Sequence, residues 1–167
     1  LSSHKKGWDE RWQEFSNWAE KAEQYKNELL KLVDADTAAF NKIMEAFALP
    51  KATPEEKTIR TQAIQDATKY AIEIPFKVMQ TAYESMEVIK AMVINGNPNS
   101  VTDAGVGALC ARSAVIGAFM NVRINAGGYT DKIYTADIIA RGADIENKTI
   151  ALEAEILKLV NEKIQAS

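Results

Sequence analysis

The stretch LPKATPEE, residues 49–56, contains a helix stop followed at once by a helix start. Proline disfavours the α conformation in the residue before it, so Pro50 ends the upstream helix. Thr53 is a favourable N-cap, Pro54 suits the first helical position, and Glu56 can close a capping box. This stretch therefore predicts two helices joined by a short connection.

Upstream of this stretch, apolar residues follow a helical 4-3 spacing from Trp8 to Phe47, with two polar interruptions. A continuous helix over this range would be roughly 60 Å long at about 1.5 Å per residue. The seam positions are Trp8, Trp12, Phe15, Ala19, Ala22, Lys26, Leu29, Val33, Asp36, Phe40, Ile43 and Phe47. The aromatic cluster at Trp8, Trp12 and Phe15 fits either the core or a subunit interface, because aromatic side chains are common in both.

Downstream, Thr53 is expected to start a helix that runs to Ile94, with Asn95-Gly96 as its stop. Its seam positions are Ile64, Ala67, Ala71, Ile74, Val78, Ala82, Met86, Ile89 and Val93. Pro75 lies in the middle of this helix, where a proline costs on the order of 3 kcal/mol and kinks the axis. We expect a bend there that serves either packing or a pocket.

A third helix is expected from about Val101 to Ile124, with Ser100 and Asp103 as a second capping box. It is apolar on nearly every face, which is typical of a helix in the centre of a bundle. Its glycines and alanines allow neighbouring helices to approach closely. Cys110, the single cysteine, is expected to be a small buried hydrophobe and cannot form an internal disulfide.

A turn at 125–128 precedes the last helix, which Thr130 is expected to cap and which runs to about Ile164. Four long helices with short connections favour antiparallel neighbours. The predicted fold is therefore all-α, an up-and-down bundle of long antiparallel helices in a single domain over residues 1–167. The 167 residues, of which 47% are hydrophobic, suffice for one packed core. A homodimer that extends the bundle is expected, because every helix is long and partly apolar.

Charge and composition argue against several function classes. A net charge of −3 and a pI near 5.3 give no basic surface for nucleic acid. No segment approaches roughly 20 consecutive apolar residues, so we expect a cytoplasmic protein without a membrane span. One histidine, His4, and one cysteine do not supply a metal-ligand set, so no metal is expected. Because Leu1 stands where a Met would be expected, the chain is expected to begin partway through a longer one.

Polar side chains at seam positions are the candidates for a functional site, because a bundle builds its sites from inward-facing residues. Asp36 falls on the seam of the first helix, where it could act on a ligand, form a structural ion pair or remain solvated. Asp34 points about 160° away around an ideal helix, at roughly 100° per residue. The two carboxylates therefore cannot form a pair on one face.

The third helix carries a second group of candidates. Asn121 and Asn125 are one turn apart and share a face. An amide offers both a donor and an acceptor, which suits a planar heterocycle, and hydrogen bonding between helices is the alternative. Arg123 fits either a ligand carboxylate or an acidic residue on another helix.

Five stretches carry a family resemblance: LVDADTAAF (32–40), ALPKATPEE (48–56), IPFK (74–77), GNPNSVTDAGV (96–106) and GAFMNVRIN (117–125). These stretches, in the order in which they occur along the chain, resemble the formimidoyltetrahydrofolate cyclodeaminase family. That family includes the cyclodeaminase domain of formiminotransferase-cyclodeaminase and the related methenyltetrahydrofolate cyclohydrolases. Family members usually open with a helix that carries a Gly-Gly-Gly-Ser-type stretch. No counterpart precedes Leu1, so the first helix of the family fold is expected to be missing upstream.

The resemblance implies an ammonia-lyase of folate one-carbon metabolism and histidine degradation. Its reaction closes 5-formimidoyltetrahydrofolate, which can be polyglutamylated, to 5,10-methenyltetrahydrofolate and releases ammonia, with no cofactor beyond this substrate. A homodimer and a formiminotransferase partner are also implied. The alternatives are a methenyltetrahydrofolate cyclohydrolase, in which water opens the same bridge, and a non-catalytic folate-binding helical module.

The resemblance also assigns roles to residues of this sequence. The implied catalytic carboxylates are Asp36 and Asp34, with Asp103 in reserve as a residue that could serve only as a cap. The residues implied to lie near the pterin are Asn99, Ser100, Asn121 and Asn125. The residues implied to lie near the glutamate tail are Lys51 and Arg123.

Overall fold

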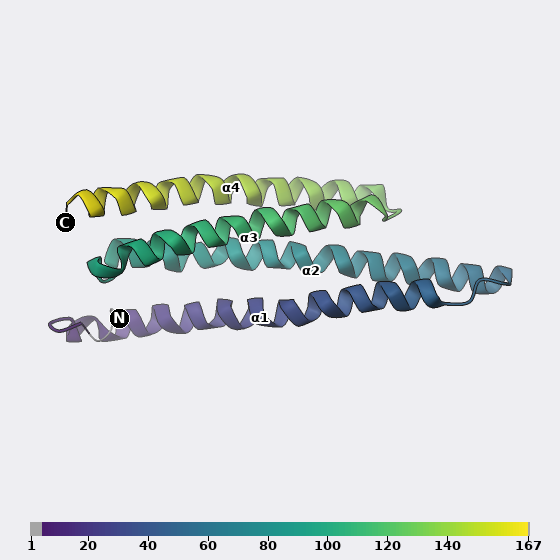
Figure 1. The fold of residues 1–167 in the computed structure, drawn as a ribbon, viewed down its shortest axis with the longest axis horizontal. Helices are drawn as coiled ribbons and strands as arrows, with labels where there is room; N and C mark the ends of the chain where they lie inside the picture. Colours follow the sequence, from purple (N-terminus) through teal and green to yellow (C-terminus); the bar gives the residue numbers. More distant parts are fainter. Residues whose placement is uncertain (1–4, 167) are drawn as a thin grey trace.

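The computed structural model describes residues 5–166, and the regular structure within that range is entirely helical. The long helices are α1 (Trp12–Ala48), α2 (Pro54–Asn95), α3 (Val101–Gly127) and α4 (Lys132–Gln165), and the short 3-10 helices are η1 (Asp9–Arg11) and η2 (Pro98–Ser100). The long helices alternate in direction, which confirms the up-and-down bundle (Figure 1). The chain start from Leu1 to His4 lies outside the described residues.

The connection between α1 and α2 forms as the sequence predicts. The Thr53 hydroxyl accepts a hydrogen bond from the Glu56 N–H at 3.2 Å. The Glu56 carboxylate accepts in return from the N–H groups of Thr53, at 3.1 Å, and Ala52, at 2.7 Å. This reciprocal capping box satisfies donors that the first turn of a helix otherwise leaves unpaired, so it fixes where α2 begins.

The central helix of the bundle is α2, which packs against α1, α3 and α4. In Figure 1, α1 lies on one side of α2, and α3 and α4 lie on the other. The prediction that the helix at 101–124 occupies the centre is therefore wrong. One face of α3 packs on α2 and α4, and its outer face exposes four large apolar side chains: Val106, Leu109, Met120 and Ile124.

Most of the core lies between α2, α3 and α4. One buried cluster includes Met79 and Phe119, and a second includes Met86 and Ile156. Gly142 of α4 faces the Phe119 ring so closely that a Cβ built on it would lie 2.4 Å from Phe119 Cε2. A glycine at this position therefore permits the close approach of α3 and α4.

The buried face of α1 differs from the predicted seam. Its buried positions are Phe15, Leu32, Ala39 and Ala46. Val33 and Phe40, which the seam prediction places inside, are each 63% exposed. The reason is that α1 packs mainly on a single helix, α2, so only a narrow strip is covered and the neighbouring apolar residues remain exposed.

Two predicted helix caps are wrong. The Ser100 side chain makes no capping hydrogen bond, because η2 runs directly into α3 and the Asn97 side chain instead accepts from the Asn99 N–H at 3.2 Å. The cap of α4 is Asp131, not Thr130. The Thr130 hydroxyl donates to Gln65 of α2 at 2.9 Å, so it serves a contact between elements.

The prediction that Cys110 is buried is wrong, because Cys110 is exposed on the outer side of α3.

By length and composition alone, the segment Pro98–Gly127 could cross a membrane. One such helix is weak evidence for a span, because the criterion considers only length and composition.

Candidate functional site

A cavity of about 450 Å³, here called the first cavity, lies between α1, α2 and α3. Its polar lining comes from Asp36 and Thr37 of α1 and from Asn121 of α3. The other lining residues are apolar: Leu29, Leu32, Val33, Pro75, Val78, Ala114 and Ala118. The fold thus brings one predicted carboxylate and one predicted amide to the same cavity.

Asp36 is accessible to a ligand in this cavity. Its side chain is exposed, and within residues 5–166 it forms neither a hydrogen bond nor an ion pair. The structural ion pair considered for Asp36 is therefore not found in the described chain. An accessible carboxylate can accept and return a proton, and the Asn121 amide can donate and accept hydrogen bonds at the edge of a heterocycle.

Asp34 does not join Asp36. It is exposed on α1 and is not among the residues that line the first cavity. This result agrees with the helical geometry, which separates the two side chains by about 160° around the axis. A site in this cavity therefore has one of the two carboxylates that the motif suggested.

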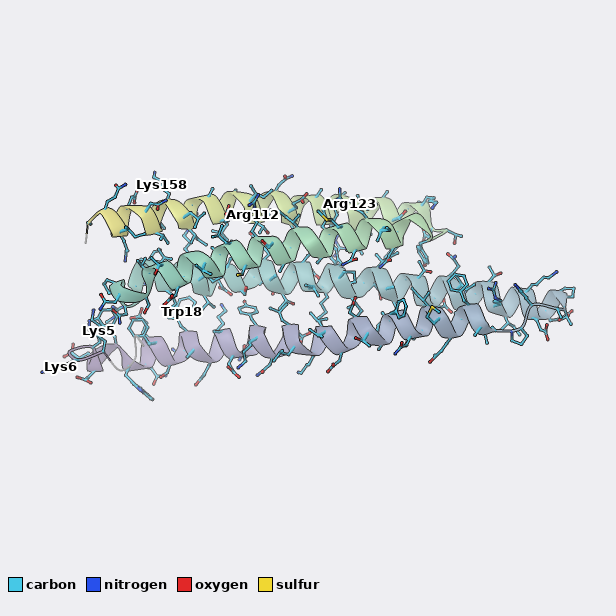
Figure 2. The ribbon with its side chains drawn as sticks, viewed as in Figure 1. Lys5, Lys6, Trp18, Arg112, Arg123 and Lys158 are labelled. Atoms are coloured by element: carbon cyan, nitrogen blue, oxygen red, sulfur yellow. The ribbon has the colours of Figure 1, made fainter. Side chains whose placement is uncertain are left out.

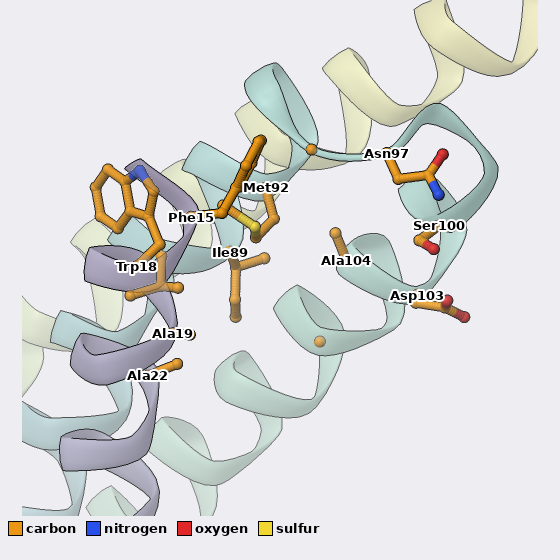
Figure 3. A pocket seen from close by; sticks show the side chains of 13 residues that line it. Phe15, Trp18, Ala19, Ala22, Ile89, Met92, Asn97, Ser100, Asp103 and Ala104 are labelled. Carbon is orange, nitrogen blue, oxygen red and sulfur yellow. The ribbon is translucent and has the colours of Figure 1, made fainter. Parts of the chain in front are cut away.

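A second cavity, of about 390 Å³, lies toward the end of the bundle where α2 is followed by η2. Figure 3 shows Phe15 and Trp18 of α1 on one side, with Ser100 and Asp103 across from them. The remaining lining residues are Ala19, Ala22, Val88, Ile89, Met92, Gly96, Asn97, Ala104 and Gly107. The cavity combines an aromatic wall with a polar rim, which suits a flat ring with polar edges.

Ser100, which was predicted to cap α3, lines the second cavity. Its side chain does not cap α3, and Asp103 lines the same cavity. Asn99, which precedes Ser100, is exposed in η2 and does not line the cavity. The structure therefore brings Ser100 and Asp103 together and leaves Asn99 outside.

The two cavities lie along the same side of the bundle but are not continuous. Their nearest lining residues on α1 are Ala22 and Leu29, and those on α3 are Gly107 and Ala114. Each pair is two helical turns apart, which corresponds to roughly 10 Å at about 1.5 Å per residue. Ser100 and Asn121 are farther apart, at roughly 30 Å along α3. A single pterin cannot contact both of them within one chain.

The residues implied to bind a glutamate tail line neither cavity. Lys51 is exposed in the connection after α1, roughly 20 Å along the chain direction from Asp36. Arg123 lies on the side of α3 away from α1 (Figure 2), and its guanidinium carbon is 4.8 Å from the centre of the Phe119 ring. Arg123 therefore has a cation–π contact where an acidic partner was considered.

Asn125 has a structural partner. Its Nδ2 donates to the carbonyl oxygen of Ala71 on α2 at 2.8 Å. Hydrogen bonding between helices was the alternative to ligand binding, and the structure shows that hydrogen bond. Asn125 is not among the residues that line the first cavity, although Asn121, one turn earlier, is.

Trp18 is the aromatic lining residue of the second cavity that the sequence analysis missed. It falls outside the 4-3 seam, which follows Phe15 to Ala19. A neighbouring stripe with i, i+3 and i+7 spacing contains Phe15, Trp18 and Ala22, and all three line the second cavity. That stripe was the sequence signal that could have identified Trp18, because two apolar stripes on one helix indicate that the helix faces two neighbouring surfaces.

Comparison with protein-family models matches residues 1–143 to the model described as formiminotransferase-cyclodeaminase. Among curated proteins, a methenyltetrahydrofolate cyclohydrolase of Methylorubrum extorquens is 31% identical, over 87% of this chain and 70% of that protein. A formimidoyltransferase-cyclodeaminase of Gallus gallus is 36% identical, over 81% of this chain and 26% of that protein. The chain thus matches about a quarter of the chicken protein.

A solved structure has the same arrangement of helices. It is a formiminotetrahydrofolate cyclodeaminase from Thermotoga maritima, with a TM-score of 0.80 and 21% sequence identity. The alignment covers 96% of this chain and 76% of that one. At this identity the likeness establishes the fold.

Proposed function

The chain belongs to the formiminotransferase-cyclodeaminase family, and we propose that it closes 5-formimidoyltetrahydrofolate to 5,10-methenyltetrahydrofolate with release of ammonia. Its curated relatives are folate one-carbon proteins, named as cyclodeaminases and a cyclohydrolase. The observation that carries the proposal is the first cavity, in which an accessible Asp36 and Asn121 line walls from different helices.

The proposed reaction moves one proton and breaks one carbon–nitrogen bond. N10 attacks the carbon of the protonated formimidoyl group on N5, which forms a tetrahedral carbon that carries an amino group. A proton then moves from N10 to this amino group. The carbon–nitrogen bond breaks, its electron pair leaves with ammonia, and N5 and N10 share the positive charge of the methenyl bridge.

Asp36 supplies the group for this proton transfer. Its carboxylate takes the proton from N10 and returns it to the departing amine, a role that typically contributes roughly 10²- to 10⁴-fold. The same negative charge lies close to where the methenyl cation develops, and this favours the product side of the reaction. Asn121 holds the pterin edge with its amide donor and acceptor.

The glutamate tail leaves the first cavity toward the α1–α2 connection in this proposal. The other direction along the bundle leads to Asp103, in a cavity that no lysine or arginine of residues 5–166 lines. By contrast, Lys42 lies between α1 and α2 on the way to the connection, together with Glu45 and Asp66. Lys51 lies in the α1–α2 connection and offers the charge opposite to that of a glutamate tail. Asp34 and Asn99 have no part in this arrangement, because they lie outside the cavities.

A methenyltetrahydrofolate cyclohydrolase is the second candidate. The observation in its favour is the Methylorubrum relative, whose match covers more of both proteins than the match to the chicken relative does. In this reaction Asp36 would activate a water molecule for attack on the methenyl carbon, and the bridge would open to the 10-formyl compound.

We also propose two partners. A formiminotransferase, named with the cyclodeaminase in the chicken relative, would supply the substrate. A second copy of the chain would cover apolar surface, since the outer sides of α1 and α3 expose large apolar side chains. Sedimentation at several concentrations tests the dimer, and a monomer throughout would contradict it.

Absorbance of the methenyl chromophore tests the proposed reaction in the full-length protein. One cuvette receives 5-formimidoyltetrahydrofolate and another receives 5,10-methenyltetrahydrofolate. A rise in the first, with ammonia in stoichiometric amount, is the expected result. A loss only in the second, faster than in buffer, would replace the proposal with the cyclohydrolase, and no change in either would favour a non-catalytic folate-binding module.

A further inference from the structure

Pro75 interrupts the backbone hydrogen bonds of α2 at the first cavity. Proline has no N–H, and its ring crowds the carbonyl four residues earlier, which here belongs to Ala71. Nevertheless, α2 continues without a break from Pro54 to Asn95. Ala71 is only 6% exposed, so water has little access to the carbonyl that Pro75 leaves without its helical donor.

Asn125 provides a donor for that carbonyl from another helix. Its Nδ2 lies 2.8 Å from the Ala71 oxygen, which is the normal length of a hydrogen bond. The bond replaces the one that Pro75 cannot donate. Because Asn125 belongs to α3, the replacement also joins α3 to α2, which a backbone bond within α2 would not do.

This bond lies beside the proposed reaction site. Pro75 and Asn121 both line the first cavity, and Asn121 precedes Asn125 by one turn of α3. Any sliding or rotation of α3 against α2 would move Asn121 relative to Asp36 on α1. The hydrogen bond restrains that motion at the level where the two side chains face the same cavity.

We propose that Pro75 and Asn125 act as a pair that sets the position of α3 at the first cavity, and that Asn125 is a positioning residue which acts through Asn121. The proline exposes a carbonyl, and the asparagine binds it. The resemblance implied that Asn125 touches the pterin, and this inference gives it a different role. The activity part of the inference rests on the proposed function, whereas the pairing itself does not.

A double-mutant cycle of stability tests the pairing in the full-length protein. The variants are Asn125→Ala, Pro75→Ala and the double variant, compared by denaturant unfolding. Asn125→Ala alone leaves a buried carbonyl unpaired, and we expect the folding equilibrium constant to fall roughly 10- to 100-fold. Pro75→Ala restores a backbone donor to Ala71, so the same asparagine substitution should then change the constant by less than about 3-fold.

Equal losses from Asn125→Ala with and without Pro75 would overturn the pairing. If Asn125→Ala does not fold, recovery of folding in the double variant supports the pairing, and failure of both variants overturns it. Asn121→Ala is the matched stability control, because its side chain lies one turn away and forms no hydrogen bond within residues 5–166. If Asn121→Ala lost as much stability as Asn125→Ala, the pairing of Asn125 with the Ala71 carbonyl would also be overturned.

Turnover distinguishes a positioning residue from a substrate ligand. We expect Asn125→Ala to lower kcat at least 10-fold in the presence of Pro75 and to have little effect in the Pro75→Ala background. If Asn125 touched the substrate, Asn125→Ala would lower kcat by the same factor in both backgrounds. That result would overturn the positioning role. The unfolding cycle needs no substrate. If the wild-type protein were inactive, the proposed reaction would be refuted, and the unfolding cycle would still test the pairing of Pro75 and Asn125.

Discussion

Replacing Gly142 by alanine should destabilise the bundle, although the same change usually stabilises a helix. The new Cβ would lie 2.4 Å from Phe119 Cε2 and 2.8 Å from Cδ2, whereas carbon atoms in contact normally lie about 3.5–4.0 Å apart. The ring is 3% exposed and belongs to a buried cluster with Ile72 and Met79, so it cannot move freely. Overpacking of this kind costs about 1–3 kcal/mol, and a clash this short belongs at the upper end.

The alanine also removes the helix penalty of glycine, which is close to 1 kcal/mol. We therefore expect Gly142→Ala to lower the free energy of unfolding by about 2 kcal/mol. Gly117→Ala is the matched control, because Gly117 lies within α3 and its added Cβ would have no neighbour within 4 Å. That variant should be stabilised by about 0.5–1 kcal/mol. Urea unfolding followed by circular dichroism measures both, and equal stabilisation of the two variants would refute the steric argument.

Three further changes test other parts of the molecule. Asp36→Asn should lower kcat by roughly 10²- to 10⁴-fold, whereas Asp34→Asn should leave turnover within a few fold, and equal turnover of both variants would refute the role of Asp36. Thr53→Ala should cost about 0.5–2 kcal/mol in urea unfolding, since it removes the N-cap oxygen of α2, and an unchanged midpoint would contradict this. Burial, followed by the hydrogen bond to Glu87, raises the pKa of Tyr25 to about 12. Stability from this tyrosine should therefore be present below about pH 10 and lost by about pH 12. Glu87→Gln should lower that pKa, as measured by tyrosinate absorbance, and an unchanged titration would exclude the carboxylate as a cause.

The helices could be predicted because their limits depend on local chemistry. The proline at 50 and the capping box of Thr53 and Glu56 act within one turn of chain, and the structure forms both as expected. The cap at Ser100 failed because a 3-10 helix precedes it and changes its backbone conformation. At Thr53 the backbone is extended, and the predicted cap forms.

The candidate site was predicted in part. The family motif and the seam position both drew attention to Asp36, and the polar residues of the third helix included Asn121; the fold places these two at one cavity. The separation of Ser100 from Asn121 was not foreseen: Ser100 lies directly before α3, and Asn121 lies roughly 30 Å further along that helix. Residues gathered by motif were treated as neighbours, whereas a long helix keeps them apart.

The sequence by itself determined that the chain is helical, where the α1–α2 hairpin turns and which polar side chains interrupt apolar faces. Only the tertiary structure decided that α2 is central, that Val33 and Phe40 are exposed, and that Asn125 binds the carbonyl that Pro75 leaves without a donor. The physical reason is the range of the interactions. Capping and periodicity act within a few residues, whereas burial and the pairing of a carbonyl with a side chain 54 residues away depend on which helix packs against which.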